Sequence, residues 1–139
     1  MPTRDLERRG ATDPTPATTE IAALFDRWNA ALQTGDPRIV AALYAPDAVL
    51  VPTVSNRVRR TRAEIEDYFA HFLTKDPRGR IVESNIRIYG DIAIDSGLYS
   101  FALTIAGVDV DLPCRYSFVY RRLGCDWRIV EHHSSVMPE

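Results

Sequence analysis

The sequence predicts an α+β fold, in which three N-terminal helices pack on a strongly curved, mainly antiparallel sheet. Apolar residues recur with helical spacing through the first half of the chain, and the period changes to two from Arg80 onward. Turns that contain glycine divide this second half into long alternating segments, a pattern typical of an antiparallel meander. A strongly curved sheet that wraps against helices forms a cone, and a cone encloses a pocket.

The N-terminal segment differs from the rest of the chain in composition. Residues 1–17 combine charge with proline and threonine and lack apolar periodicity, so we expect a disordered tail there. Residues 18–139 are expected to form a single domain, because the chain has only 139 residues. The first helix follows Thr18 or Thr19 as N-cap and ends at Gly35. Its apolar stripe consists of Ile21, Leu24, Phe25, Trp28 and Leu32.

Two more helices and a short strand complete the first half. Asp36-Pro37 pairs an N-cap with a proline at the first helical position, which predicts a short helix closed by Pro46 and carrying Tyr44. A short strand is expected over residues 48–53. Thr61-Arg62-Ala63-Glu64 is a capping box and predicts a third helix. The apolar face of that helix carries Ile65, Tyr68, Phe69 and Phe72.

The second half predicts four long strands. They are expected over residues 80–89, 92–105, 109–122 and 127–136. The last strand turns from Trp127, Ile129 and Val130 to His132-His133-Ser134-Ser135. Polar groups cost free energy to bury unless they are satisfied, so this strand is expected to face a cavity or a partner.

The pairing of the last two strands predicts a polar cluster. If the loop covers residues 123–126, Ser117 lies opposite His132 and Arg115 lies opposite Ser134. Opposed residues share a face, so these four side chains are expected together, although a slip of one residue would exchange the faces. Alternation on the preceding strand places Asp95, Gly97, Tyr99 and Phe101 beside them. The helices would supply the apolar walls through Trp28, Tyr44, Tyr68 and Phe72.

Several short motifs give the chain a family resemblance. They are Gly35-Asp36, the Gly90-Asp91 turn, Tyr120-Arg121-Arg122, and Trp127-Arg128-Ile129-Val130 before His132-His133-Ser134-Ser135. Over about residues 18–139 the chain resembles the NTF2-like superfamily, and within it the bacterial relatives of the calcium/calmodulin-dependent kinase II association domain. It also resembles the small NTF2-like proteins of enediyne antibiotic biosynthetic clusters. The superfamily hosts isomerases, dehydratases, cyclases and non-catalytic hubs, so the resemblance predicts the fold more firmly than the function.

The two faces of the sheet are assigned by conflicting arguments. Burial alone would send the aromatic face of the last hairpin to the core. The resemblance implies the reverse, with the cavity on the polar face and a homodimer formed through the outer face. We follow the resemblance, because an open cavity needs small residues such as Gly97, Ser117 and Ser134, and dimers bury aromatic stripes. The expected dimer face consists of Tyr116, Phe118, Tyr120, Trp127 and Ile129.

The polar cluster suggests acid and base chemistry. His132, oriented by Asp95, is the candidate general base, while Arg115 and Tyr99 would stabilise an enolate. The resemblance implies a cofactor-independent isomerase or cyclase that acts on a polyketide intermediate of enediyne biosynthesis. Alternatively, His132 only bonds Ser117 or a backbone carbonyl, and Arg115 only pairs with a nearby carboxylate. A non-catalytic oligomerisation or carrier module, similar to a kinase hub, is the other function class. The expected ligand-binding residues are Arg115, Tyr99, Ser117, Ser134, Trp28, Tyr44, Tyr68 and Phe72.

Other partners and cofactors are not expected. His132 and His133 point to opposite faces, and His71 has no ligand at i+4, so no metal site is predicted. The formal net charge of −2, with interspersed signs, argues against nucleic acid. The absence of a signal peptide and of a long apolar run predicts a cytoplasmic protein without a membrane partner. Arg57, Arg59, Arg60 and Arg62 form the one basic run, for which a solvated loop is favoured over an anion or partner site.

Overall fold

A computed structural model of the protein describes residues 14–139, so residues 1–13 of the tail expected over residues 1–17 lie outside the described part. The helices are α2 (Pro14–Gln33), α3 (Pro37–Ala41) and α4 (Arg62–Phe72), and a 3-10 turn, Leu73–Lys75, follows α4. The strands are β1 (Tyr44–Val51), β2 (Arg78–Tyr89), β3 (Ile92–Ile105), β4 (Val108–Leu123) and β5 (Asp126–Val136). The predicted α+β fold is confirmed, and no helix of the described part is long and apolar enough to cross a membrane.

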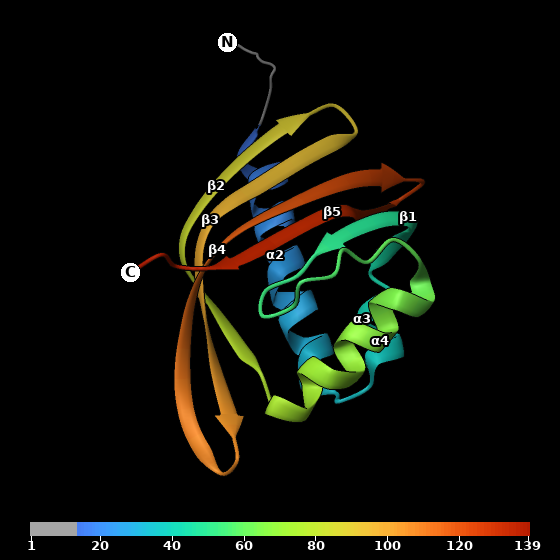
Figure 1. Ribbon diagram of the computed structural model, residues 1–139. Helices are drawn as coiled ribbons and strands as arrows, with labels where there is room; N and C mark the ends of the chain where they lie inside the picture. Colours follow the sequence, from blue (N-terminus) through green and yellow to red (C-terminus); the bar gives the residue numbers. More distant parts are fainter. Residues whose placement is uncertain (1–13) are drawn as a thin grey trace.

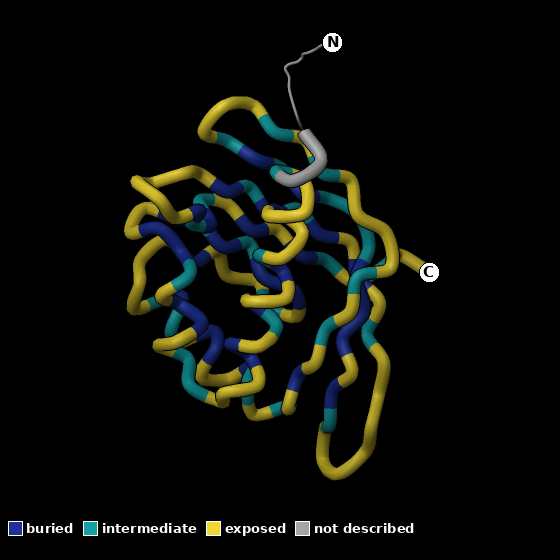
Figure 2. The backbone as a smooth tube through the Cα atoms, turned by 180° about the vertical axis from the view of Figure 1, so that it is seen from behind, coloured by how far each residue is buried: buried dark blue, intermediate teal, exposed yellow. Residues whose placement is uncertain are grey.

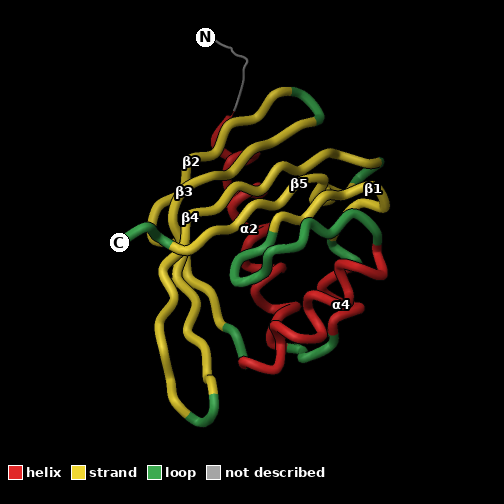
Figure 3. Tube along the Cα trace, viewed as in Figure 1, coloured by secondary structure: helices red, strands yellow, loops and turns green. Residues whose placement is uncertain are grey.

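The strands form one curved sheet that the helices cover on a single side (Figure 1). The strand order is β1-β5-β4-β3-β2. Only β1 pairs in parallel, with β5, and the other neighbours are antiparallel. Helix α2 runs across the concave face, while α3 and α4 lie at one end of it (Figure 1 and Figure 3). This arrangement is the predicted cone.

Helix α2 begins earlier than the sequence predicts. It starts at Pro14, so residues 14–17, which were expected in the tail, are helical. Proline suits a first helical position, because its backbone φ is already helical and its missing N–H has no partner to lose there. Four residues of the predicted stripe are buried and Leu24 is half-buried. The helix ends before Gly35, whose φ of 73° is in the left-handed region.

The caps of the two shorter helices follow the prediction. The Asp36 side chain accepts from the backbone N–H of Arg38 at 2.9 Å, and Thr61 Oγ1 accepts from that of Glu64 at 3.2 Å. The assignment of Tyr44 to a helix was wrong. It is the first residue of β1 and pairs with Ile129, because sheet pairing with β5 replaces helical bonds after Ala41.

The aromatic face of the last hairpin lies in the core. Buried positions alternate with more exposed ones along the backbone of the sheet (Figure 2). Its residues are at most 6% exposed within the single chain, namely Tyr116, Phe118, Tyr120, Trp127 and Ile129. The prediction that these residues form an outer dimer face was therefore wrong. The burial argument holds here, because the concave face needs large apolar side chains to fill the space beneath α2.

A β-bulge at Val130 shifts the register of the last hairpin by one residue. Near the turn, Tyr120 pairs with Ile129 as predicted, but the next pair on β4 and β5 is Val119 with Glu131. Val130 is the extra residue. Beyond the bulge, His132 and Ser134 share a face with Phe118 and Tyr116 and not, as predicted, with Ser117 and Arg115.

Gly97 on β3 was expected to leave room for a cavity. The structure shows instead that a glycine is needed there for the close packing of two strands. A Cβ on Gly97 would lie 2.1 Å from the backbone oxygen of Glu83. This close approach occurs where the register of β2 shifts between Ile81 and Glu83. Only glycine allows the two strands to come so near.

Candidate functional site

A chain of hydrogen bonds connects α2 to β5 through the core. Trp28 Nε1 donates to the Tyr44 hydroxyl at 3.2 Å, and that hydroxyl lies 2.8 Å from His132 Nδ1. His132 Nε2 lies 3.1 Å from the Tyr99 hydroxyl, which donates to Ser134 Oγ at 2.7 Å. All five side chains are buried. Their polar groups are therefore satisfied by one another.

The hydrogen bonds of this series can all point in one direction, from Trp28 to Ser134, so that each donor in the series has an acceptor. Because the Trp28 indole can only donate, the Tyr44 oxygen accepts from it and its own proton is free for His132 Nδ1. The proton of His132 then sits on Nε2 and is donated to Tyr99, which donates in turn to Ser134. This pattern assigns the tautomer of His132.

Burial keeps this chain of groups uncharged. Desolvation, and then the neighbouring His133, lower the pKa of His132 to about 3. Burial raises the pKa of Tyr44 and of Tyr99 well above 10. The imidazole of His132 stacks on Phe118 with ring centroids 4.0 Å apart, which leaves no room for a counter-ion there. At neutral pH the chain consists of a neutral imidazole between two neutral phenols.

A small cavity lies at the Ser134 end of the chain. It is lined by Trp28, Leu50, Pro52, Thr53, Tyr68, Phe69, Phe72, Tyr99, Phe101, His132 and Ser134. The structure thus brings together Trp28, Tyr68, Phe72, Tyr99, His132 and Ser134 from the predicted site. The volume of about 10 Å³ is enough for a single water. The walls are mainly aromatic, so the hydroxyls and the imidazole are its few polar features.

Two larger hollows flank the segment that follows β1. One, of about 330 Å³, shares Tyr68 and Phe72 with the inner cavity, and the other, of about 390 Å³, shares Pro52, Thr53 and Ser134. Both hollows include Val54 and Ser55. Residues 52–55 therefore separate the inner cavity from the outside, and we call them the mouth segment. The backbone of Val54 is in the left-handed region with φ of 51°, which costs energy for a β-branched residue.

Asp95 belongs to a different polar cluster. Its Oδ1 accepts from Ser84 Oγ at 2.8 Å and from the Tyr116 hydroxyl at 2.9 Å. Burial raises the pKa of Asp95 in spite of these bonds and of the nearby Arg87. The expected pairing of Asp95 with His132 is wrong, because Phe118 on β4 is the neighbour of both and lies between them.

Arg115 and Ser117 are not part of the cavity. Both lie on the outer face of β4, where Arg115 pairs with Ser135 and Ser117 with His133. The bulge at Val130 is the cause, since it sends His132 and Ser134 inward without the residues expected opposite them. Arg115 is exposed, and none of the ion pairs between described residues includes it.

Sequence reasoning missed two features of the site. Tyr44 was expected as a wall but holds Nδ1 of His132, a contact that depends on β1 lying beside β5. Thr53 closes the cavity, and its backbone oxygen accepts from the Tyr68 hydroxyl at 3.0 Å. No sequence signal marked either contact, because each depends on how separate elements pack, across 88 positions for Tyr44 and His132 and 15 for Thr53 and Tyr68. The described residues contain no group of three or more side chains that could hold a metal ion.

The curved mixed sheet with its covering helices is an NTF2-like, cystatin-like fold. A Streptomyces avermitilis protein described as a dehydratase of the NTF2-like family superposes with a TM-score of 0.80 at 16% identity, covering 91% of this chain and all of that one (100%). An NTF2-like superfamily protein from Salmonella enterica superposes with a TM-score of 0.78 at 17% identity, covering 91% of this chain and 95% of that one. These similarities show the fold.

The family follows from closer matches. The model of the calcium/calmodulin dependent protein kinase II association domain matches residues 17–138, and the chain belongs to this family. A Xanthomonas campestris protein described as such a domain is 55% identical, with a TM-score of 0.85 over 86% of this chain and 87% of that one. The Steroid Delta-isomerase of Nocardioides simplex is 40% identical over 52 residues, so the match spans only 42% of that enzyme and 37% of this chain.

Proposed function

We propose that the protein binds a small, largely apolar metabolite in the inner cavity and recognises one oxygen atom of it. The observation that carries this proposal is the directed hydrogen-bond chain, which ends at Ser134 in a cavity with aromatic walls. A ligand oxygen near Ser134 would accept the proton that Tyr99 now donates. Such a site, with apolar walls and a few oriented polar groups, has the usual composition of a small-molecule pocket.

Binding requires the mouth segment to move. The inner cavity holds about 10 Å³, whereas the hollows on either side of residues 52–55 hold about 330 Å³ and 390 Å³. Displacement of these residues joins the inner cavity to the hollow of about 390 Å³, which also includes Ser134, and admits a metabolite. The left-handed backbone of Val54 favours this motion, because leaving that conformation relieves strain.

An isomerase or cyclase role fits this site if His132 is not the general base that the sequence suggested. A histidine with a pKa of about 3 accepts protons poorly at neutral pH, so it is a weak general base. We assign it instead as a positioning residue, which holds the Tyr99 hydroxyl ready to donate to an enolate oxygen. The segment similar to a Steroid Delta-isomerase supports this reaction class. The resemblance to enediyne-cluster proteins makes a polyketide-type intermediate our first choice of substrate, and a cytoplasmic homodimer its setting.

A non-catalytic oligomerisation or carrier module is the second candidate. Two observations favour it, namely the membership of an association-domain family and an interior that is packed almost to completion. In that function the hydrogen-bond chain serves only to satisfy buried polar groups.

Native mass spectrometry of the purified protein tests the proposal against this alternative. We expect a bound metabolite on the wild-type protein that is lost from Ser134→Ala and retained by Ser117→Ala. Ser134 lines the inner cavity, whereas Ser117 lies on the outer face of β4 and lines neither the inner cavity nor the two larger hollows. A wild-type oligomer without any bound molecule, after exposure to an extract of the producing cells, would support the module instead.

A further inference from the structure

We infer a second ligand site outside the inner cavity, in the hollow between α4 and residues 54–59, for small molecules that carry a phosphate monoester. This anion hollow has a volume of about 330 Å³. It is lined by Val54, Ser55, Arg57, Arg59, Asp67, Tyr68, His71, Phe72 and Lys75. The inference does not depend on what the inner cavity binds.

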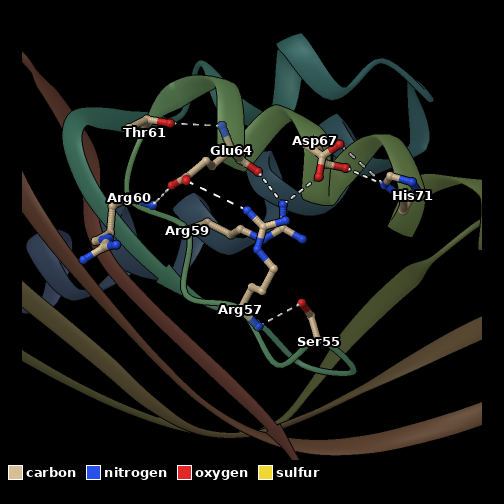
Figure 4. Close-up of polar contacts among 8 residues, drawn as sticks. All are labelled: Ser55, Arg57, Arg59, Arg60, Thr61, Glu64, Asp67 and His71. Carbon is tan, nitrogen blue, oxygen red and sulfur yellow. Dashed lines mark hydrogen bonds and ion pairs between the residues drawn. The ribbon is translucent and has the colours of Figure 1, made fainter.

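Arg59 is the fixed cation of the anion hollow (Figure 4). It is only 7% exposed, and its Nη1 donates to Asp67 Oδ2 at 2.8 Å and to the Glu64 backbone oxygen at 3.0 Å. Its backbone is held by two hydrogen bonds of 2.8 Å to Leu50. Nε of Arg59 is buried and has no partner among the described residues. A buried guanidinium group whose N–H donors are not all used in hydrogen bonds attracts an anion strongly.

The charges around Arg59 are not balanced. Arg57, Arg59 and Lys75 line the hollow as three cations, while Asp67 is the one carboxylate among the lining residues, so these four sum to +2. The hydrogen bond from Arg59 is the main reason that the pKa of Asp67 is lowered, so this carboxylate is already committed. Arg57 has only a distant contact, 4.0 Å from Glu64 Oε2. A phosphate monoester, with a charge near −2 at neutral pH, supplies the missing counter-charge.

The remaining walls fit the ester group and its oxygens. Ser55 Oγ accepts from the Arg57 backbone at 3.4 Å, which leaves the hydroxyl proton of Ser55 free to donate to a phosphate oxygen. Tyr68 and Phe72 offer ring surface for an aromatic or alkyl substituent. The anion hollow therefore combines a doubly charged end with an apolar side.

The other two arginines of the basic run are used differently. Arg62 donates to the backbone oxygens of Ala41 and Tyr44 at 3.0 and 3.2 Å, so it joins α4 to the start of β1. Arg60 is exposed and does not line the anion hollow. The favoured reading of the whole run as a solvated loop therefore fits Arg60 and the exposed Arg57 but not the buried Arg59, and the sequence alone could not separate them.

Isothermal titration calorimetry with phenyl phosphate and inorganic phosphate, at constant ionic strength, tests this site. We expect both to bind, with phenyl phosphate tighter, and to shift the backbone NMR signals of Ser55, Arg57 and His71. Arg57→Gln should weaken binding of phenyl phosphate about tenfold, since it removes one charged hydrogen bond. Arg60→Gln is the matched control, three residues away and outside the anion hollow, and should bind like the wild type.

Three results would overturn the inference. They are no measurable binding of phenyl phosphate, equal losses in Arg57→Gln and Arg60→Gln, and benzoate binding as tightly as phenyl phosphate, which would remove the requirement for a double charge. Ser134→Ala should leave phenyl phosphate binding unchanged. A failure of the inner cavity to hold a metabolite is thereby distinguishable from a failure of the anion hollow.

Discussion

His132 and Asp95 are both buried polar groups on the concave face of one sheet, and only Phe118 lies between them, yet their surroundings differ. His132 bonds a tyrosine through each ring nitrogen, and both tyrosines continue to further partners. Asp95 receives two hydroxyl donors on a single oxygen, without an ion pair among those of the described residues. The first group is a neutral link in a chain, and the second is a buried charge that its neighbours only partly satisfy.

This difference gives the two groups opposite effects on stability as the pH changes. The folded pKa of His132, about 3, lies below its ordinary value of 6.5, so its contribution is complete above 6.5 and is lost as the pH falls toward 3. The folded pKa of Asp95 lies above its ordinary 3.8, so its contribution is complete below 3.8 and is lost as the pH rises through the folded value. A fall in pH therefore destabilises the region around His132 and stabilises the region around Asp95.

Removal of the imidazole should have the largest effect. His132→Ala leaves the hydroxyls of Tyr44 and Tyr99 without their shared partner and opens a cavity against Phe118. We expect the free energy of unfolding to fall by about 4 kcal/mol, from the sum of cavity and unsatisfied-group costs. Urea denaturation at pH 7 measures it.

The adjacent histidine supplies the control for that measurement. His133 is exposed on the outer face of β5, so His133→Ala should change the free energy of unfolding by less than about 0.5 kcal/mol. Similar losses in the two variants would show that the inward placement of His132, and with it the bulge at Val130, is wrong.

The acid side of the stability curve should depend on His132. Between about pH 6 and pH 4 the unfolded chain protonates this residue and the folded chain does not, so stability falls by up to about 1.4 kcal/mol per pH unit from this group alone. Urea denaturation across this range should give a shallower slope for His132→Gln than for the wild type. Parallel slopes would mean that His132 is already charged in the folded protein.

The elements of the fold were predictable because their signals are local. The caps at Asp36 and Thr61 and the change of period near Arg80 involve only neighbouring residues, and all three occur in the structure. The placement of Tyr44 was not predictable in this way. It depends on the pairing of β1 with β5, whose residues lie more than 80 positions apart at the contact between Tyr44 and His132.

The candidate site was predictable only up to the bulge. The polar residues of β5 drew attention to His132 and Ser134, and both do face the interior. The aromatic residues of β4 also face it, as burial alone required. In a regular hairpin the aromatic residues of β4 and the polar residues of β5 would lie on opposite faces. The prediction therefore had to place one of these two sets on the outer face. The extra residue Val130 resolves that conflict, and no turn or proline marks it in the sequence.

The region around Asp95 should become more stable when the charge of the carboxylate is removed. Asp95→Asn keeps an oxygen that can accept from Ser84 and Tyr116 and eliminates the cost of the buried carboxylate. We expect about 1 kcal/mol more stability than the wild type at pH 8, with the difference shrinking as the pH falls and Asp95 becomes protonated. Thermal unfolding at several pH values measures this. A variant that is less stable at every pH would show that the carboxylate is fully satisfied.

The smallest predicted change in stability comes from a comparison of Tyr120 with Tyr99, two buried tyrosines of which only Tyr99 forms hydrogen bonds through its hydroxyl group within the described part of the chain. The hydroxyl of Tyr120 is buried and has no hydrogen-bond partner among the described residues, and its pKa is raised by burial and then by the charge of Asp95. Tyr120→Phe removes only this unsatisfied group, so the free energy of unfolding should stay within about 0.5 kcal/mol of the wild type or rise slightly. Tyr99→Phe is the matched comparison and should cost about 2 kcal/mol, because it strands both His132 Nε2 and Ser134 Oγ. Equal costs at the two positions, measured by urea denaturation, would mean that the hydrogen-bond chain adds nothing beyond the packing of its rings.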